Sequence, residues 1–255
     1  NGVQFDAPLP EQTSFTLELP KDFKDASGRT LRNAASFPLR VATAGLPPLA
    51  KLAAAPFGVV ERFAEGPDGP ALLPVTLRNV EAGLKVQGLQ AGAAPAPTPP
   101  VPPVPPTGKV STLKPSTDAD IIAWFRKVAR YDDYHVPRRV AARDVKGPLP
   151  KVIDDERDHV QTRMLSLLAG QGGVKTLDLP QVTGKELRPF EVVGIPLPPG
   201  FHVVEIASQK LGASLLDGRH GEGRTMYVRT SALVTNLGVH FKLGRENAAV
   251  WVTSL

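Results

Sequence analysis

The sequence predicts a mainly β protein, built of antiparallel β-sandwich modules with a short helical insertion. Glycine and proline, with 23 and 27 of the 255 residues, are too abundant for a packed helical protein and favour short strands joined by turns. Most apolar runs are short and alternate with polar residues, which is typical of strands with one buried face. No apolar run approaches the roughly 20 residues that a membrane-spanning helix needs.

The N-terminal part predicts two neighbouring strands. Apolar residues occupy alternate positions from Phe15 to Leu19, and a run at the same spacing extends from Phe37 to Val41 after a turn-rich stretch. We expect these runs to pair antiparallel, with Pro38 at a sheet edge or a strand start. The paired prolines Pro47 and Pro48 follow, and we expect a module boundary there.

The next part predicts short strands and a proline-rich segment. Apolar runs bounded by Gly or Pro lie at residues 57–63, 72–80 and 84–89. Residues 95–106 read PAPTPPVPPVPP and favour the extended polyproline II conformation. We interpret this segment as a stiff spacer or an exposed loop.

Residues 117–170 carry the helical insertion. Thr117 to Asp120 have the form of a capping box, and the apolar residues that follow predict a helix from Asp118 to about Tyr131. We expect a second helix from about Asp155 to a stop at Gly170. Its apolar face would contain Val160, Met164, Leu167 and Leu168.

The C-terminal part returns to strands, predicted at residues 190–195, 201–207, 226–234, 237–243 and 248–253. The run from Leu237 to Leu243 has the cleanest alternation in the chain. We therefore expect three parts: residues 1–46 as the end of a preceding module, 47–223 as a central module, and 224–255 as the start of the next.

The search for chemistry is mostly negative. The chain contains no cysteine, which excludes a thiol nucleophile, a disulfide and a thioester within these residues. It also has no metalloprotease, nucleophile-elbow or P-loop motif. The net charge of +5 is modest and the basic residues are scattered, so we expect no nucleic-acid binding. We expect no enzyme, no cofactor and no metal site.

Two charged clusters remain as candidates. Asp132, Asp133 and His135 are suitable for acid–base or metal chemistry, which a hydrolase would use, but they equally suit a solvated helix end. The basic stretch that follows is typical of the polar face of a helix and its loop. It could also dock an anionic partner through Arg138, Arg139 and Arg143.

Three strings resemble the N-terminal half of bacterial alpha-2-macroglobulins. They are RTLRNAASFPLRVATAGLPPLAKLAAAPFGVVER at 29–62, RPFEVVGIPLPPGFHVVEIASQKLG at 188–212, and RTMYVRTSALVTNLGVHFKLGRENAAVWVTSL at 224–255, the most specific. The helix DADIIAWFRKVARYDD is similar to an insertion of that family. The resemblance implies macroglobulin-like (Ig-like) antiparallel β-sandwich modules with a helical insertion.

The resemblance also implies a function for the full-length protein. It would be a periplasmic lipoprotein anchored to the inner membrane, which traps proteases through a bait region and a Cys-x-x-Gln thioester. Because this chain has no cysteine and begins at Asn1 without Met, we expect it to be a scaffold piece of a longer polypeptide. The thioester, the bait region and the lipid anchor would lie outside it. A class A penicillin-binding protein is an implied partner.

An alternative hypothesis belongs to a different class of function. The chain would be a cell-envelope docking module that binds a peptidoglycan synthase or another envelope protein through the helical insertion or the loop after it.

Overall fold

The computed structural model describes residues 4–6, 9–61, 71–81, 85–88, 109–150, 158–177, 190–216, 218 and 222–254. Over these residues the fold is mainly β, with several antiparallel sheets and three α-helices. The chain divides into two compact units, residues 1–47 and 48–255. The proline-rich segment expected at 95–106 lies outside the described residues.

The first unit contains one small sheet. Strands β1 (Ser14–Leu17) and β2 (Leu39–Ala42) pair antiparallel, with Phe15 opposite Val41, so the predicted pairing is confirmed. Pro38 immediately precedes β2, and the 3-10 helix η1 (Ala34–Ser36) lies just before it. None of the described residues of this unit is buried, so its strands have no core of their own.

The second unit contains two larger sheets. The six-stranded sheet has the order β10 (Lys175–Thr176), β6 (Lys85–Gly88), β7 (Lys109–Leu113), β12 (Gly200–Ser208), β13 (Met226–Thr235) and β4 (Phe57–Glu61). The three-stranded sheet has the order β11 (Glu191–Leu197), β5 (Ala71–Arg78) and β3 (Leu49–Leu52). The expectation of purely antiparallel sheets is wrong at two pairs, β6–β7 and β4–β13, which are parallel. Each of these pairs is joined through a long connection, as parallel strands require.

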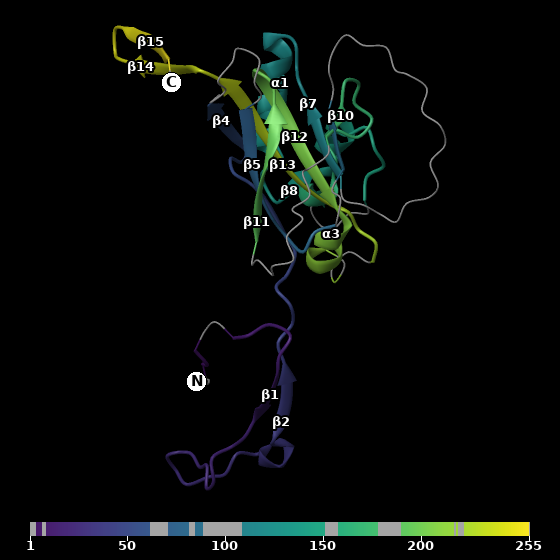
Figure 1. The fold of residues 1–255 in the computed structure, drawn as a ribbon, viewed down its shortest axis with the longest axis vertical. Helices are drawn as coiled ribbons and strands as arrows, with labels where there is room; N and C mark the ends of the chain where they lie inside the picture. The colour runs from purple at the N-terminus through teal and green to yellow at the C-terminus, as the bar shows by residue number, and fades with distance from the viewer. Residues whose placement is uncertain are drawn as a thin grey trace. The chain divides into compact units, whose positions relative to one another are not determined.

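The two sheets pack face to face over the main core. Alternate residues of β5 and β11, among them Leu73, Val75 and Ile195, are fully buried and contact the same cluster as Val204 and Ile206 of β12. Figure 1 shows β5 and β11 on one side of β12 and β13. This is the two-layer arrangement that one-sided alternating strands form to bury their apolar faces.

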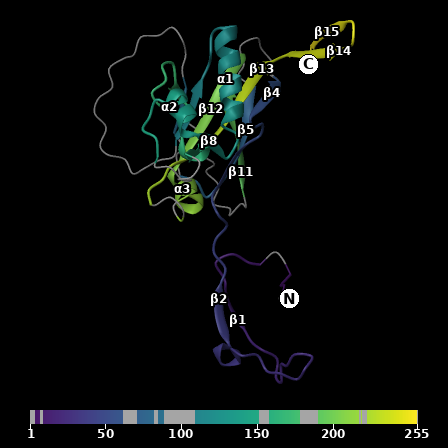
Figure 2. The same cartoon turned by 180° about the vertical axis from the view of Figure 1, so that it is seen from behind.

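The helical insertion covers the opposite face of the six-stranded sheet. It contains α1 (Asp118–Arg130), β8 (His135–Pro137), α2 (Arg138–Asp144), β9 (His159–Gln161) and the 3-10 helix η2 (Thr162–Met164). Figure 2 shows α1 and α2 on this side. Phe201 and Val203 of β12 belong to the second core, with Val128 of α1. Strand β12 is therefore buried from both sides, which explains why its sequence is almost continuously apolar.

Helix α1 forms where the sequence predicts it. Thr117 accepts a hydrogen bond from the Asp120 backbone N–H (3.1 Å) and donates to the Asp120 carboxylate (2.7 Å). Acidic residues occupy the first turn and basic residues the last, which suits the helix dipole. The predicted capping box is thus a working N-cap.

The second predicted helix is wrong. Its start at Asp155 lies outside the described residues, and from Asp158 to Gly170 the chain forms β9, η2 and irregular backbone. The apolar residues Val160, Leu167 and Leu168 are buried as expected. The segment closes single turns within itself at Leu165 and Gln171, but Val160 pairs with Val136 of β8, and the Leu167 N–H donates to Glu205. Tertiary hydrogen bonds therefore replace the helical ones.

A short helix that the sequence analysis did not predict follows β12. Helix α3 (Gln209–Leu215) begins at Ser208, whose hydroxyl accepts from the Leu211 N–H (3.1 Å) and donates to the Glu81 carboxylate (2.8 Å). Glu81 also accepts from the Lys210 N–H (2.8 Å). The carboxylate satisfies backbone donors that a helix N-terminus leaves open, so residues far apart in sequence start this helix.

The last strands form a separate hairpin. Among the described strands, β14 (Leu237–Leu243) and β15 (Ala248–Ser254) pair only with each other, and almost all of their residues are exposed. The expected module start at residue 224 lies just before β13. Residues Met226 to Thr235 form β13, which pairs with β12 along nine residues inside the second unit.

Candidate functional site

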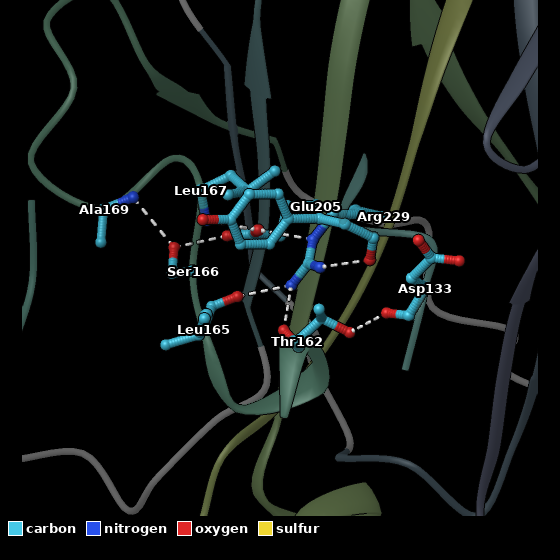
Figure 3. A network of polar contacts seen from close by, with 9 residues as sticks. Asp133, Thr162, Leu165, Ser166, Leu167, Ala169, Glu205 and Arg229 are labelled. Carbon is cyan, nitrogen blue, oxygen red and sulfur yellow. Dashed lines mark hydrogen bonds and ion pairs between the residues drawn. The ribbon is translucent and has the colours of Figure 1, made fainter. Parts of the chain in front are cut away.

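A buried ion pair lies between the six-stranded sheet and the helical insertion. Glu205 of β12 and Arg229 of β13 stand directly opposite each other in the strand register, and Arg229 Nε lies 3.3 Å from Glu205 Oε2. Both side chains are buried. They lie on the face of the six-stranded sheet that also carries Phe201 and Val203 of β12. Figure 3 shows the pair and the loop around it. Two opposite charges at this position need partners for all their polar groups.

The partners come from the insertion. Arg229 donates to the backbone carbonyls of Tyr131 (3.3 Å), Thr162 (3.0 Å) and Leu165. Figure 3 shows the last two of these bonds, which both start at the Arg229 Nη2 atom. One guanidinium group thus holds the end of α1 and the turn η2 against the sheet.

Glu205 holds the next part of the same loop. Its carboxylate accepts from the Ser166 hydroxyl and from the Leu167 N–H (2.9 Å). The Ser166 hydroxyl in turn accepts from the Ala169 N–H (2.9 Å). With Arg229, three donors face this carboxylate, so its oxygens are committed to structural hydrogen bonds. The arrangement fits a clamp between sheet and insertion rather than a proton-transfer site.

The electrostatics of the neighbouring groups agree with this interpretation. Burial lowers the pKa of Arg229, and the adjacent Glu205 carboxylate opposes that effect by stabilising the charged guanidinium. Burial also raises the pKa of Tyr131 to about 12, and the negative charge of Asp144 adds to the shift. The phenol therefore stays neutral at physiological pH.

An open groove of about 320 Å³ adjoins the network. Strand β3, the end of α1, η2, α3 and β13 all contribute to its lining, which includes Lys51, Tyr131, Asp132, Arg163, Leu215 and Arg229. The Arg229 guanidinium group is already bonded to three carbonyls, so it does not offer a free charge to this groove.

The predicted acid and histidine cluster lies on the surface. Asp132, Asp133 and His135 are all exposed, and only Asp132 lines the groove. His135 makes an edge contact with the Tyr134 ring at 4.6 Å. Across the described ranges no three His, Asp or Glu side chains gather as metal ligands would. These positions match the alternative interpretation, a solvated helix end, and we do not propose a hydrolase.

The three predicted docking arginines lie on α2 but have different surroundings. Arg138 is half-buried and donates to the Pro150 carbonyl (2.9 Å), so it holds the loop after α2. Arg139 is exposed. Arg143 is exposed and pairs with the buried Asp144 carboxylate at 3.1 Å, which Arg130 of α1 also contacts at 2.8 Å. Of these three arginines, Arg143 is therefore the one that shares a carboxylate partner, Asp144, with an arginine of α1.

Sequence reasoning missed Glu205 and Arg229. The available signal was a single charged residue inside each of two apolar strands, FHVVEIAS and MYVRTSALV. An isolated charge in a strand that is otherwise apolar indicates a paired buried group, because burying it alone is costly.

Comparisons with known proteins add no further identification. A scan against protein-family models matched none, and searches of curated proteins and of solved structures found no match. Over the described residues, no helix has the length and apolar character needed to cross a membrane.

Proposed function

We propose that this chain is a structural scaffold segment of a bacterial alpha-2-macroglobulin that traps proteases in the periplasm. The resemblance of residues 29–62, 188–212 and 224–255 to the N-terminal half of that family motivates the proposal. The chain would supply macroglobulin-like (Ig-like) β-sandwich modules, while the bait and the thioester act elsewhere in the longer protein. The complete absence of cysteine from these residues agrees with that division.

The exposed apolar face of the β14–β15 hairpin is the observation that carries the proposal. Leu237, Val239, Phe241 and Leu243 lie on one face of β14, each between 55% and 74% exposed. Val250 and Val252 of β15 stand opposite Phe241 and Val239 in the register, so both strands contribute to this face. A two-stranded hairpin is marginally stable in water, and a large exposed apolar face needs a covering layer.

A following module would provide that layer. The hairpin would contribute its first strands, and the remaining strands of the sandwich would pack on the apolar face. In this proposal the following module would start near residue 236, after β13, rather than at residue 224.

The first unit supports the same arrangement. Its two strands form a complete register over four residue pairs, yet none of its described residues is buried. It too resembles part of a β module without its second layer. The chain would thus carry the last strands of one module and the first strands of another. Between them lie the two larger sheets and the helical insertion, which we call the central unit.

The central unit has the properties of a rigid link. Its six-stranded sheet is covered on both faces, by the three-stranded sheet and by the insertion. The Glu205–Arg229 clamp fixes the insertion through five hydrogen bonds to its backbone and side chains. Closely packed layers of this kind transmit strain with little deformation. A trap that reshapes itself after cleavage needs such links between its moving parts.

The same proposal assigns location and partners. The full-length protein would be held at the inner membrane by a lipid on a cysteine outside these residues. Its partners would be the proteases that it captures and, by the same resemblance, a class A penicillin-binding protein.

Sequencing the reading frame on both sides of these residues tests the proposal. We expect a lipobox cysteine upstream and a Cys-x-x-Gln motif downstream, together with β-type sequence directly after residue 255. A frame without either motif would overturn the assignment to this family. A stop codon directly after residue 255 would remove the following module.

A further inference from the structure

The ends of α1 and α2 place four cationic side chains on one surface. Lys127 and Arg130 come from the last turn of α1, Arg143 comes from the last turn of α2, and Lys146 follows α2. We call these four residues the cationic surface. Arg130 and Arg143 keep 42% and 67% of their side chains exposed, and Lys146 is exposed. Arg130, Arg143 and Lys146 can therefore meet a ligand from solvent, and Lys127 lies half-buried beside them.

Among the described residues, Asp144 is the one carboxylate that pairs with these cations. Asp144 is buried beneath them and contacts Arg130 at 2.8 Å and Arg143 at 3.1 Å. Over the part of the chain that the structure describes, Lys127 and Lys146 form no ion pair. Burial lowers the pKa of Lys127, and Arg130, Lys146 and Arg143 lower it further, although Asp144 acts against them. The cations are thus close enough to repel one another.

The backbone holds this arrangement in place. Val128 of α1 and Ala141 of α2 are buried in the second core, so both helices are fixed against the sheet. The Lys127 ammonium group lies 4.3 Å from the centre of the Trp124 ring, which positions it by a cation–π contact. The dipole of α1 favours cations at its last turn, but it does not account for Lys146, which belongs to no helix.

The remaining hydrogen-bond donors indicate the kind of partner. Each guanidinium group has five N–H donors, and the bonds to Asp144 use one from Arg130 and one from Arg143. Asp144 fixes the orientation of both groups, and a guanidinium held in this way suits a second planar carboxylate. Two unpaired lysines beside it favour a ligand with several negative charges. This geometry suits carboxylate side chains better than the diffuse charge of a membrane surface, to which flexible lysine-rich segments bind.

We propose that the cationic surface is a docking site for an acidic segment of a partner protein. This goes beyond the scaffold function, and the two proposals can fail independently. A reading frame without a thioester motif would leave the docking site untouched, and loss of docking would leave the family assignment untouched.

A fluorescence-anisotropy titration with a labelled glutamate-rich peptide tests this proposal. The whole chain should bind the peptide with an affinity that falls steeply as salt rises. The double variant Lys127→Gln/Lys146→Gln should bind about tenfold more weakly, because it removes the two cations of the surface that form no ion pair in the described structure. Thermal unfolding should change little, because Lys146 is exposed and Lys127→Gln removes only the contact with the Trp124 ring.

A matched pair of variants separates a specific site from general charge. Lys109→Gln/Lys242→Gln removes two exposed lysines of strands β7 and β14 and changes the net charge equally. It should leave the affinity within about twofold. Equal weakening by both double variants would overturn the proposal, and so would the absence of peptide binding at low salt. Binding to phosphatidylglycerol vesicles without binding to the peptide would assign the surface to membranes instead and would also overturn it.

Discussion

At the residue scale, Arg229 is the most demanding position in the central unit. Its guanidinium group neutralises Glu205 and satisfies three carbonyls. Replacing it by Met leaves a buried carboxylate without its counter-charge. We expect Arg229→Met to lower the free energy of unfolding by about 3–5 kcal/mol, measured by urea denaturation.

An exposed arginine supplies the control. Arg143 also pairs with a carboxylate, but 67% of its side chain is exposed and Asp144 keeps Arg130 as a partner. Arg143→Met should therefore cost less than about 1 kcal/mol. The double variant Glu205→Leu/Arg229→Met should be less destabilised than Arg229→Met alone, because no buried charge remains. Similar losses for Arg143→Met and Arg229→Met would contradict the role of burial.

His202 makes stability depend on pH. The side chain is 3% exposed, its Nε2 lies 2.7 Å from the Pro198 carbonyl, and burial lowers its pKa from 6.5 to about 4. Between these values the unfolded chain binds a proton that the folded protein does not. Stability is therefore fully present above about pH 6.5 and falls as the pH decreases to about 4, by about 3 kcal/mol from this group.

Substitution of His202 should remove this part of the pH dependence. We expect His202→Gln to flatten the change in unfolding free energy between pH 6.5 and 4 relative to the unmodified protein. His240→Gln, which changes an exposed histidine of β14, should leave the curve unaltered. Parallel curves for the His202 variant and the unmodified protein would show that another group causes the acid sensitivity.

At the element scale, α3 depends on one glycine. A Cβ atom at Gly212 would lie 1.6 Å from the Arg224 backbone oxygen, a contact that only movement of the main chain could relieve. We expect Gly212→Ala to destabilise the central unit by about 3 kcal/mol, measured by thermal or urea unfolding. At Gly147 nothing lies within 4 Å of the added atom, so Gly147→Ala should be neutral or slightly stabilising. Equal stability of both variants would contradict the close packing of α3.

Local patterns predicted the elements that depend on local interactions. The helix from Asp118 followed from its capping box, and the strand from Leu237 to Leu243 followed from strict alternation. The second predicted helix failed for the opposite reason. Its apolar spacing is real, but Glu205 and Arg229 bind the backbone of Leu167, Thr162 and Leu165 and hold it in an irregular course. Such competition from distant side chains is not visible in a short window of sequence.

The ion pair shows the same limit for the site. Glu205 and Arg229 lie 24 positions apart, and only the register of β12 with β13 places them opposite each other. The sequence shows two isolated charges in apolar strands, but not that they meet. Conversely, Asp132, Asp133 and His135 are neighbours in sequence and yet remain exposed side chains without a shared pocket.

At the scale of the whole molecule, the central unit contains two buried cores, whereas the β1–β2 sheet and the β14–β15 hairpin contain no buried residue. The central unit buries residues from both faces of β12, whereas almost every residue of β14 and β15 is exposed. One part of the chain therefore has a buried core, and the other exposes an apolar face. This contrast is what a string of β modules would show at a junction.

The hairpin face should make the isolated chain associate. We expect Val239→Lys/Phe241→Lys to reduce self-association of residues 1–255 in sedimentation-velocity experiments, while the thermal unfolding of the central unit stays unchanged, because this face covers nothing in the described structure. Gly238 and Thr253 face the opposite side of the hairpin, so Thr253→Lys adds a charge there and serves as the control. Within a longer protein that contains the following module, the same double substitution should instead destabilise, since the two lysines would be buried. Unchanged stability in that longer protein would show that no module covers the face.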